Sequence, residues 1–478
     1  MQNKPTSDGS SQVEFYDLMV KKVFKDACIN KMLVHDSHAR ELPRYIFEWL
    51  VSKYQSDGNL TPEAKQELYQ LIDEHFPEPE RIELYKYRIL RQGEEIALLN
   101  PLRVRIDSLS NTFVPYMPFF AGESKHLLIS DEIVDKNKGL LLNGLWGIST
   151  IAPGTSDYKP FKIKSFTPVQ IEEVRIEDFI EARGFFSLPE WVDLLINTMG
   201  LNPREFPSIA EKVYLVARLI PYVENNFNLV EMGPKGTGKS FIHKNISTHV
   251  HVIGGGTVSR AQLFYQLARN ERGLLLMNDV VVFDDFSNIR LEQANEVIGK
   301  LKNYMADGKV DVGKFNEAAT TSVVIMGNVA INEQGEPRER FHFRNLPREM
   351  QESAFLDRIA AFIPGWRLHA IRGQDLSSNY GLIGDWFSEV LHQFRRRNHY
   401  MADIETKIHF NGRTRDETCA KATASGLIKL LFPNKNLADE DWRFVAKIAV
   451  DMRQRVLDQL AYIDAEFQDK HVSFDIIQ

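Results

Sequence analysis

Residues Phe227–Phe241 have the sequence F-N-L-V-E-M-G-P-K-G-T-G-K-S-F. An apolar run ends at Gly233, and Gly233–Ser240 then follow the pattern G-x-x-x-x-G-K-S before helix-compatible residues resume at Phe241. A strand, a glycine-rich turn and a helix in this order are the setting that a phosphate-binding loop needs. The sequence therefore predicts an α/β fold built around such a loop. A plain glycine turn is the alternative, and the complete pattern with both flanks disfavours it.

The residue types within the loop match the chemistry of a triphosphate. Glycines let several backbone N–H groups point at phosphate oxygens, and the helix that starts near Lys239 adds the positive end of its dipole. Lys239 is placed to reach the β- and γ-phosphates, and Ser240 to bind Mg²⁺. ATP and Mg²⁺ are therefore the predicted ligands. The predicted nucleotide-binding residues are Gly233, Pro234, Lys235, Gly236, Thr237, Gly238, Lys239 and Ser240.

Two later apolar runs end in polar side chains. Val280–Phe283 is followed by Asp284 and Asp285, and Ser322–Gly327 is followed by Asn328. Parallel strands of an α/β sheet present their carboxyl ends to the ligand crevice. Asp284 is therefore predicted to hold Mg²⁺ through water, Asp285 to polarise the attacking water, and Asn328 to bind that water or the γ-phosphate. Taken alone, all three would be turn residues at strand ends; the phosphate loop upstream favours the catalytic interpretation.

Basic residues further along the chain supply other candidates. The segment D-G-K-V-D-V-G-K at 307–314 predicts a β-hairpin that carries Lys309 and Lys314. Arg358 follows the third catalytic strand, where an arginine can reach the γ-phosphate held by a neighbouring subunit. A surface Asp–Arg pair explains the same spacing equally well. Lys421 lies on a predicted helix at 416–431, within a C-terminal helical lid.

Composition bounds the class of protein. The 478 residues carry a net charge of −7 and 43% apolar residues, which is ordinary for a soluble globular chain and leaves room for local basic patches. The two cysteines, Cys28 and Cys419, lack metal-ligand spacing, so we predict buried free thiols and no structural zinc. Neither an apolar signal core nor a run of 18 apolar residues occurs. We therefore expect a cytoplasmic protein that does not enter membranes.

The hydrophobic period divides the chain into six expected segments. Period-two alternation at 102–106 and 161–164 indicates strands, and strand-length apolar runs occur at 126–129 and 140–148. The alternating pairs Arg103/Arg105 and Lys162/Lys164 predict a solvated strand face, or alternatively a track for nucleic acid. The expected segments are a disordered tail at 1–13, a helical region at 14–87, a β-rich domain at 88–170 that is expected to bind DNA, linker helices at 171–205, the nucleotide-binding core at 206–378, and a helical lid with C-terminal helices at 379–478.

These motifs together resemble the BrxL family, the Lon-related AAA+ proteins of bacterial BREX phage-defence systems. The resemblance extends over almost the whole chain. It is carried by N-L-V-E-M-G-P-K-G-T-G-K-S at 228–240, V-V-V-F-D-D at 280–285, F-L-D-R-I-A-A-F-I-P-G-W at 355–366 and S-G-L-I-K-L-L at 425–431. It implies an AAA+ ring ATPase, a homo-hexamer or a dodecamer of two stacked hexamers, that encircles double-stranded DNA and restricts phage, with other BREX proteins as partners.

The resemblance also implies roles for individual residues. It assigns Asn328 as a first sensor of the nucleotide, Arg358 as an arginine finger acting on the neighbouring subunit, and Lys421 as a second sensor on the lid. The hairpin at 307–314 is similar to one in MCM replicative helicases, in which a lysine at the place of Lys314 faces the pore and touches DNA phosphate. Lys309 and Lys314 are accordingly the predicted DNA-binding residues.

Two departures from the family qualify these expectations. Relatives usually have Asp-Glu where this sequence has Asp284–Asp285, so we expect slow hydrolysis. Many relatives continue into a protease-like domain with a Ser–Lys pair, which nothing here supplies, so no peptidase activity is expected. Two alternatives remain. A protein unfoldase would need an aromatic pore loop, for which Phe264–Tyr265 is the nearby candidate, although its spacing is typical of a helix core. A clamp that binds ATP without hydrolysing it would follow from Asp285.

Overall fold

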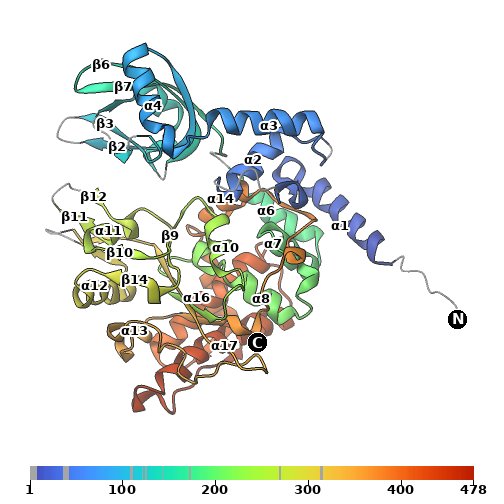
Figure 1. Ribbon diagram of the computed structural model, residues 1–478. Helices are drawn as coiled ribbons and strands as arrows, with labels where there is room; N and C mark the ends of the chain where they lie inside the picture. The colour runs from blue at the N-terminus through green and yellow to red at the C-terminus, as the bar shows by residue number, and fades with distance from the viewer. Residues whose placement is uncertain are drawn as a thin grey trace. The chain divides into compact units, whose positions relative to one another are not determined.

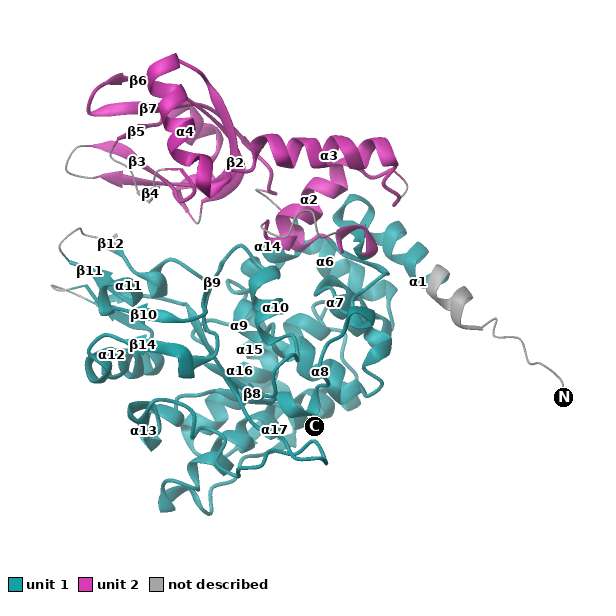
Figure 2. Cartoon of the chain, viewed as in Figure 1, with its two compact units in different colours: residues 1–31, 175–382, 387–478 teal, residues 32–174, 383–386 magenta. Residues whose placement is uncertain are grey.

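The computed structural model describes residues 8–35, 42–56, 58–107, 111–120, 122–123, 126–142, 144–171, 174–267, 271–312 and 316–477. The chain forms two compact units (Figure 2). Unit 1 comprises residues 1–31, 175–382 and 387–478, and unit 2 comprises residues 32–174 and 383–386. Figure 1 gives the path of the chain through both. Among the described helices, none is both long enough and apolar enough to cross a membrane.

Unit 1 is built on a five-stranded sheet in which all neighbouring strands are parallel. The strand order is β18-β8-β17-β13-β9. Strand β8, which precedes the phosphate loop, therefore lies between β17 and β18, the last two strands of this sheet in chain order. The strands are β8 (Leu229–Gly233), β9 (Val250–Ile253), β13 (Val280–Phe283), β17 (Ser322–Asn328) and β18 (Ala361–Pro364). The residues of β8, β13, β17 and β18 are almost all buried, as expected for a parallel sheet covered on both faces, whereas the edge strand β9 is mostly half-buried. This confirms the predicted α/β fold.

The helices of unit 1 surround this sheet. In sequence order they are α1 (Asp8–Phe24), α6 (Ile176–Ala182), α7 (Leu188–Thr198), α8 (Ile209–Ala217), α9 (Ile220–Val223), α10 (Lys239–Asn245), α11 (Arg260–Leu263), α12 (Ala294–Asp307), α13 (Ser353–Leu356), α15 (His399–Lys407), α16 (Thr414–Leu431) and α17 (Asp439–Leu460), with α14 (Gly384–Phe394) divided between the two units. Helix α7 shows how they are anchored. Its Trp191 is fully buried and donates its indole N–H to the carbonyl of Leu430 at 2.8 Å.

Pairs of short strands complete unit 1. They are β1 (Cys28–Asn30) with β19 (Tyr380–Leu382), β10 (Gly256–Val258) with β14 (Ile289–Leu291), β11 (Tyr265–Gln266) with β12 (Glu271–Arg272), β15 (Lys309–Asp311) with β16 (Asn316–Ala318), and β20 (Ile408–Asn411) with β21 (Ser473–Ile476). The β15–β16 pair is the hairpin predicted at 307–314, but its second strand begins at Asn316 and therefore later than expected. Both cysteines are free thiols; Cys28 is buried and Cys419 is half-buried.

In its described residues, unit 2 combines a sheet with several helices. The sheet has the order β4-β3-β2-β6-β7-β5 and is antiparallel except where β5 meets β7. Its strands are β2 (Ile96–Asp107), β3 (Thr112–Met117), β4 (Gly122–Glu123), β5 (Leu127–Leu128), β6 (Leu145–Ser156) and β7 (Lys159–Pro168), and its helices are α2 (Arg44–Tyr54), α3 (Pro62–His75), α4 (Ile82–Tyr87) and α5 (Asp131–Lys136). Alternate residues of β2 and β7 face a buried apolar core, which is why the sequence alternates there. Thr61 caps α3 as its sequence suggests, accepting from the N–H of Ala64 at 3.2 Å.

Several expected boundaries differ from the structure. Helix α1 begins at Asp8, so residues 8–13 are helical and not a disordered tail; residues 1–7 lie outside the described part. The helical region expected at 14–87 is divided, because β1 pairs with β19 and this places residues 1–31 in unit 1. The helices expected as a linker at 171–205 are an integral part of unit 1, since α7 is largely buried. The apolar run at 140–148 becomes a strand only from Leu145 and begins in a 3₁₀ turn.

Candidate nucleotide site

The phosphate loop opens onto a pocket of about 540 Å³ at the carboxyl ends of the parallel strands. The pocket is lined by Lys235, Gly236, Thr237, Gly238, Lys239, Ser240, Phe241, Gly254, Asp284, Asp285, Asn288, Met326, Gly327, Asn328, Ile371 and Leu376. Strand pairing explains why the three predicted strand ends meet there. Asn328 pairs with Gly233 in register, and Phe283, which precedes Asp284, pairs with Ile325. The structure therefore brings the loop, the acidic pair and the asparagine to one edge of the sheet.

Backbone conformation shapes the loop. Gly236 and Gly238 have φ values of +87° and +76°, a region that favours glycine. A Cβ atom on Gly238 would lie only 2.2 Å from the Cδ1 atom of Ile371. Ile371 also donates its backbone N–H to the carbonyl of Gly236 at 2.8 Å. The segment around Ile371, which no sequence motif identified, therefore closes over the loop.

Lys239 is buried at the start of α10. Its ammonium donates to the carbonyls of Gly233 and Pro234, at 3.1 and 2.8 Å. Burial lowers the pKa of this lysine, and the charges of Glu231 and Asp284 oppose that effect. The ammonium is thus held within the loop, where phosphate oxygens are better partners than the neutral carbonyls that hold it here.

The oxygen ligands expected for Mg²⁺ are already in contact. Ser240 donates its hydroxyl to the Oδ1 atom of Asp284 at 2.7 Å, and the ammonium of Lys244 lies 3.8 Å from Oδ2. A hydroxyl beside a carboxylate is a donor set that suits Mg²⁺, a hard cation that also keeps several waters. Ser240 and Asp284 therefore fit the ion that the fold implies.

Asp285 has a strained backbone and a tightly held side chain. Its φ of +54° is unusual for a residue with a side chain. Its Oδ1 atom accepts from the hydroxyl of Ser287 and its Oδ2 atom from the amide of Asn288, both at 2.8 Å. Asn288 itself lines the pocket. These bonds fix the direction of a carboxylate that is one methylene shorter than the usual glutamate.

We expect the substitution Asp285→Asn to lower kcat for ATP hydrolysis by about 10²–10⁴-fold, because the amide cannot accept the proton of the attacking water. Nucleotide affinity should change little, since the phosphate loop is intact. Phosphate release and nucleotide binding measured on the same preparation test this. The matched control is Glu292→Gln, which neutralises an exposed acid a few residues along the chain. Wild-type turnover equal to that of Asp285→Asn would instead support a clamp that does not hydrolyse ATP.

The structure does not bring the remaining predicted residues into this pocket. Arg358 precedes β18 and lies at the amino ends of the strands, away from the carboxyl ends that carry the pocket. There its carbonyl accepts from the side-chain amide of Asn228, just before β8. Lys421 lies on α16 with its ammonium 3.6 Å from a carboxylate oxygen of Glu405. Lys309 is exposed on β15, and Lys314 lies outside the described residues.

The predicted alternative for Arg358, a pair with its neighbour Asp357, is not what forms. The carboxylate of Asp357 is buried and accepts from the guanidinium groups of Arg413, Arg415 and Arg453. Arg358 donates to the carbonyl of Ala354, and its Nε atom has no hydrogen-bond partner among the described residues. Among the described residues, its guanidinium therefore donates to a backbone carbonyl and not to a carboxylate.

Sequence reasoning missed one buried feature beneath the loop. Arg218 and Glu231 form a fully buried ion pair with two N···O contacts, at 2.9 and 2.6 Å. Arg218 also donates to the carbonyl of Thr237 within the phosphate loop at 3.0 Å. The only sequence signal was an acidic residue inside an apolar strand, because a buried carboxylate requires a partner. Nothing in the sequence identified Arg218 as that partner.

Comparisons with known proteins agree with the fold. A family model described as "Lon-like protease BrxL-like, ATPase domain" matches residues 161–473, and one described as "BREX system Lon protease-like protein BrxL N-terminal" matches residues 22–152. A protein named Lon-like protease BrxL from Escherichia coli O9:H4 (strain HS) is 28% identical, over 98% of this chain and 68% of its own. Another of the same name, from Bacillus cereus (strain H3081.97), is 32% identical, over 91% of this chain and 65% of its own.

These figures also show that the chain spans about two thirds of the length of both relatives. Among solved structures, a full-length MCM homolog from Methanopyrus kandleri aligns over 76% of this chain and 78% of its own, with 13% identity and a TM-score of 0.38.

Proposed function

The chain belongs to the BrxL family, and from that premise we propose that it is an ATP-hydrolysing ring that encloses double-stranded DNA in BREX defence against phage. The ring is a homo-hexamer or two stacked hexamers, and other BREX proteins are its partners. Two facts stand behind the proposal: the chain has the AAA+ ATPase fold, and the matched family model is an ATPase domain. Enclosure of DNA, ring assembly and the role in defence are the steps that require experiment.

The observation that carries the proposal is that the predicted catalytic groups lie at opposite ends of the parallel strands, with the pocket at the carboxyl ends and Arg358 at the amino ends. Lys239, Ser240 and the Asp284–Asp285 pair line the pocket, but no arginine does so among the described residues. Arg358 lies beside the start of β8, whereas the phosphate loop follows its end, roughly 15 Å away at 3.3 Å per residue. An arginine placed in this way can serve a pocket on an adjacent subunit, which favours assembly as a condition for hydrolysis.

Each residue of the pocket has a definite task in this proposal. The backbone N–H groups of the loop and the ammonium of Lys239 bind the β- and γ-phosphates. Ser240 and Asp284 would hold Mg²⁺, which would supply positive charge to neutralise the charge that develops on the phosphates. Asp285 accepts a proton from the attacking water, and Asn328 orients that water. Segment 365–376, with Ile371 and Leu376 in the lining, helps to exclude other solvent from the phosphate loop.

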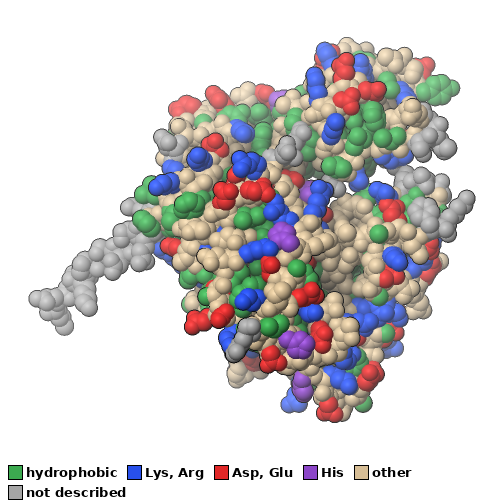
Figure 3. All heavy atoms as spheres, turned by 180° about the vertical axis from the view of Figure 1, so that it is seen from behind, with side chains coloured by type: hydrophobic (Ala, Val, Ile, Leu, Met, Phe, Trp, Pro, Cys, Tyr) green, Lys and Arg blue, Asp and Glu red, His purple; other side chains and the backbone are tan. Residues whose placement is uncertain are grey.

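The DNA-binding part of the proposal depends on local cations. On the face drawn in Figure 3, Lys and Arg are interspersed with Asp and Glu, so that face offers no broad cationic surface. Lys309 is exposed on the β15–β16 hairpin. In unit 2, Lys164 pairs with Glu95 at 2.7 Å, which weakens the predicted track on β7. The hairpin is therefore the better candidate for contact with phosphates.

The alternative function, a protein unfoldase, is less well supported. Such rings use an exposed aromatic pair on a pore loop, and Phe264–Tyr265 is the candidate named above. Phe264 is buried; its backbone N–H donates to the carbonyl of Arg260 in α11, and its carbonyl accepts from the N–H of Gly273. It is therefore part of the core of unit 1, and it is not available to grip a polypeptide.

We expect duplex DNA to bind with low sequence preference and with an affinity that falls steeply as salt rises, because contacts to phosphate release counterions. Electrophoretic mobility shift at several salt concentrations, with and without ATP, measures this. The variant Lys309→Glu should weaken binding and lower the salt slope. Glu292→Gln, which alters an exposed residue outside the hairpin, is the control. Absence of binding at low salt in both nucleotide states would reject the DNA-enclosing function and leave the ATPase assignment in place.

A further inference from the structure

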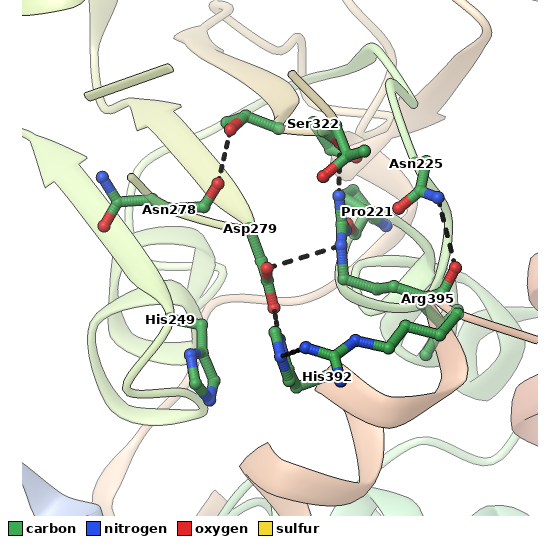
Figure 4. Close-up of polar contacts among 12 residues, drawn as sticks. Pro221, Asn225, His249, Asn278, Asp279, Ser322, His392 and Arg395 are labelled. Atoms are coloured by element: carbon green, nitrogen blue, oxygen red, sulfur yellow. Dashed lines mark hydrogen bonds and ion pairs between the residues drawn. The ribbon is translucent and has the colours of Figure 1, made fainter. Parts of the chain in front are cut away.

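A second cluster of side chains that commonly bind metals lies at the amino ends of the parallel strands, whereas the nucleotide pocket lies at their carboxyl ends. His249 immediately precedes β9, and Asp279 immediately precedes β13, its parallel neighbour. His392 comes from α14, in the part of that helix that belongs to unit 1. Figure 4 shows the three side chains converging. Strand β13 separates this cluster from Asp284 by roughly 15 Å, so the two sites are distinct.

The geometry of the cluster is compact. One ligand-type atom from each of the three residues lies within 4.8 Å of those of the other two. The Nδ1 atom of His392 is 2.6 Å from the Oδ2 atom of Asp279, and the two imidazole rings stack with centroids 4.3 Å apart. The side chains of His249, Asp279 and His392 are only 8%, 13% and 21% exposed. Two imidazoles and a carboxylate are thus largely shielded from solvent.

Surrounding groups orient these side chains. The Nε2 atom of His249 is 2.6 Å from a carboxylate oxygen of Glu389, which resembles the outer carboxylate that commonly supports a metal-binding histidine. The Oδ1 atom of Asp279 lies 3.5 Å from the Nε atom of Arg395, as Figure 4 shows. Burial would raise the pKa of Asp279, but the hydrogen bond from His392 and the charge of Arg395 bring it below its ordinary value. The carboxylate is therefore ionised, as a metal ligand must be.

We propose that His249, Asp279 and His392 form a binding site for a divalent transition-metal ion of the Zn²⁺ type. Imidazole nitrogens with one carboxylate are typical ligands of Zn²⁺ and its first-row neighbours, whereas Mg²⁺ and Ca²⁺ take mainly oxygen. Three protein ligands leave a fourth position for water. The ion ties α14 to the starts of β9 and β13, and so joins the lid side of unit 1 to its sheet. The sequence predicted no structural zinc because it contains no closely spaced cysteines, whereas the ligands of this cluster lie far apart in the chain.

Binding requires small, definite adjustments. A tetrahedral ion with bonds of about 2.1 Å brings its ligands to roughly 3.4 Å from one another, so the stacked rings must tilt toward the ion. The proton between His392 and Asp279 leaves the Nδ1 atom, which then coordinates. The Nε2 atom of His392 becomes a donor, so the guanidinium of Arg396, now 3.4 Å from it, turns away into solvent.

The test uses the whole chain, freed of metal and of nucleotide so that the phosphate-loop site does not contribute. Equilibrium dialysis against Zn²⁺ should give about one ion per chain, and Co²⁺ should show the intense d–d absorption of a four-coordinate site. The variants His249→Ala and His392→Ala should bind at least about tenfold more weakly, and Glu389→Gln about tenfold more weakly, because it acts through His249. The control is His409→Ala, which removes an exposed histidine on β20.

The Co²⁺ spectrum of the wild-type chain keeps the test independent of whether any variant folds. A weak, six-coordinate spectrum, or Zn²⁺ binding that is equal in the wild type and in the double variant His249→Ala/His392→Ala, overturns the proposal. Neither result depends on ATP hydrolysis. Loss of Zn²⁺ binding in the cluster variants with retention in His409→Ala supports it.

Discussion

Replacing Arg358 by alanine should lower kcat for ATP hydrolysis by about 10³–10⁵-fold while leaving ATP affinity nearly unchanged. The reason is its position. Arg358 lies outside the pocket of its own subunit, and its guanidinium is bound to a backbone carbonyl in place of a carboxylate. Under the proposed function, we therefore expect Arg358 to contribute to hydrolysis only when a neighbouring subunit supplies the nucleotide. Steady-state phosphate release and nucleotide binding, measured in parallel, separate the loss of turnover from a loss of binding.

Mixing variants distinguishes an action on the neighbour from a local structural role. Arg358→Ala and Lys239→Ala should each be inactive alone, but a mixed assembly contains some interfaces that combine an intact pocket with an intact arginine. Partial recovery of turnover on mixing is the expected result. The control is Arg344→Ala, which removes an exposed arginine paired with Glu339 in the same unit. Full activity of Arg358→Ala, or a failure of mixing to restore any turnover in stable assemblies, would contradict the role in the ring.

Breaking the buried Arg218–Glu231 ion pair beneath the phosphate loop should lower the local free energy of unfolding by about 3–5 kcal/mol. In Glu231→Gln the guanidinium of Arg218 keeps its charge in a site from which water is excluded, since both side chains are at most 1% exposed. Arg218 also holds the carbonyl of Thr237, so the loop should open more often. Hydrogen exchange of peptides from β8 and the loop measures the opening free energy directly.

The double variant Arg218→Met/Glu231→Leu removes both charges together and should cost less than either single change, because no unpaired ion stays buried. Glu339→Gln serves as the control, since the exposed pair that it breaks should contribute about 1 kcal/mol or less. If the amide hydrogens of β8 and the loop exchanged at the wild-type rate in single variants of Arg218 or Glu231, the ion pair would not stabilise the loop.

Sequence alone was sufficient for features that depend on local pattern. The glycine spacing at 233–240 specified the phosphate loop, and apolar runs ending in Asp284 or Asn328 specified strands and their ligand-facing ends. These inferences hold because the period of a strand and the conformational freedom of glycine are properties of a few neighbouring residues. Local pattern also explains the errors. The apolar run at 140–148 has the length of a strand, yet the strand begins only at Leu145, because the preceding residues form a 3₁₀ turn.

Sequence by itself therefore determined the chemistry of the loop, the identity of the polar strand ends and the α/β class. Only the tertiary structure decided that residues 1–31 join unit 1, that Arg358 lies outside the lining of its own pocket, and that Arg218 partners Glu231. It alone assembled His249, Asp279 and His392. The physical reason is that a pattern reports which face or end of an element a residue occupies, whereas its partner is chosen by packing between segments that lie far apart in the chain.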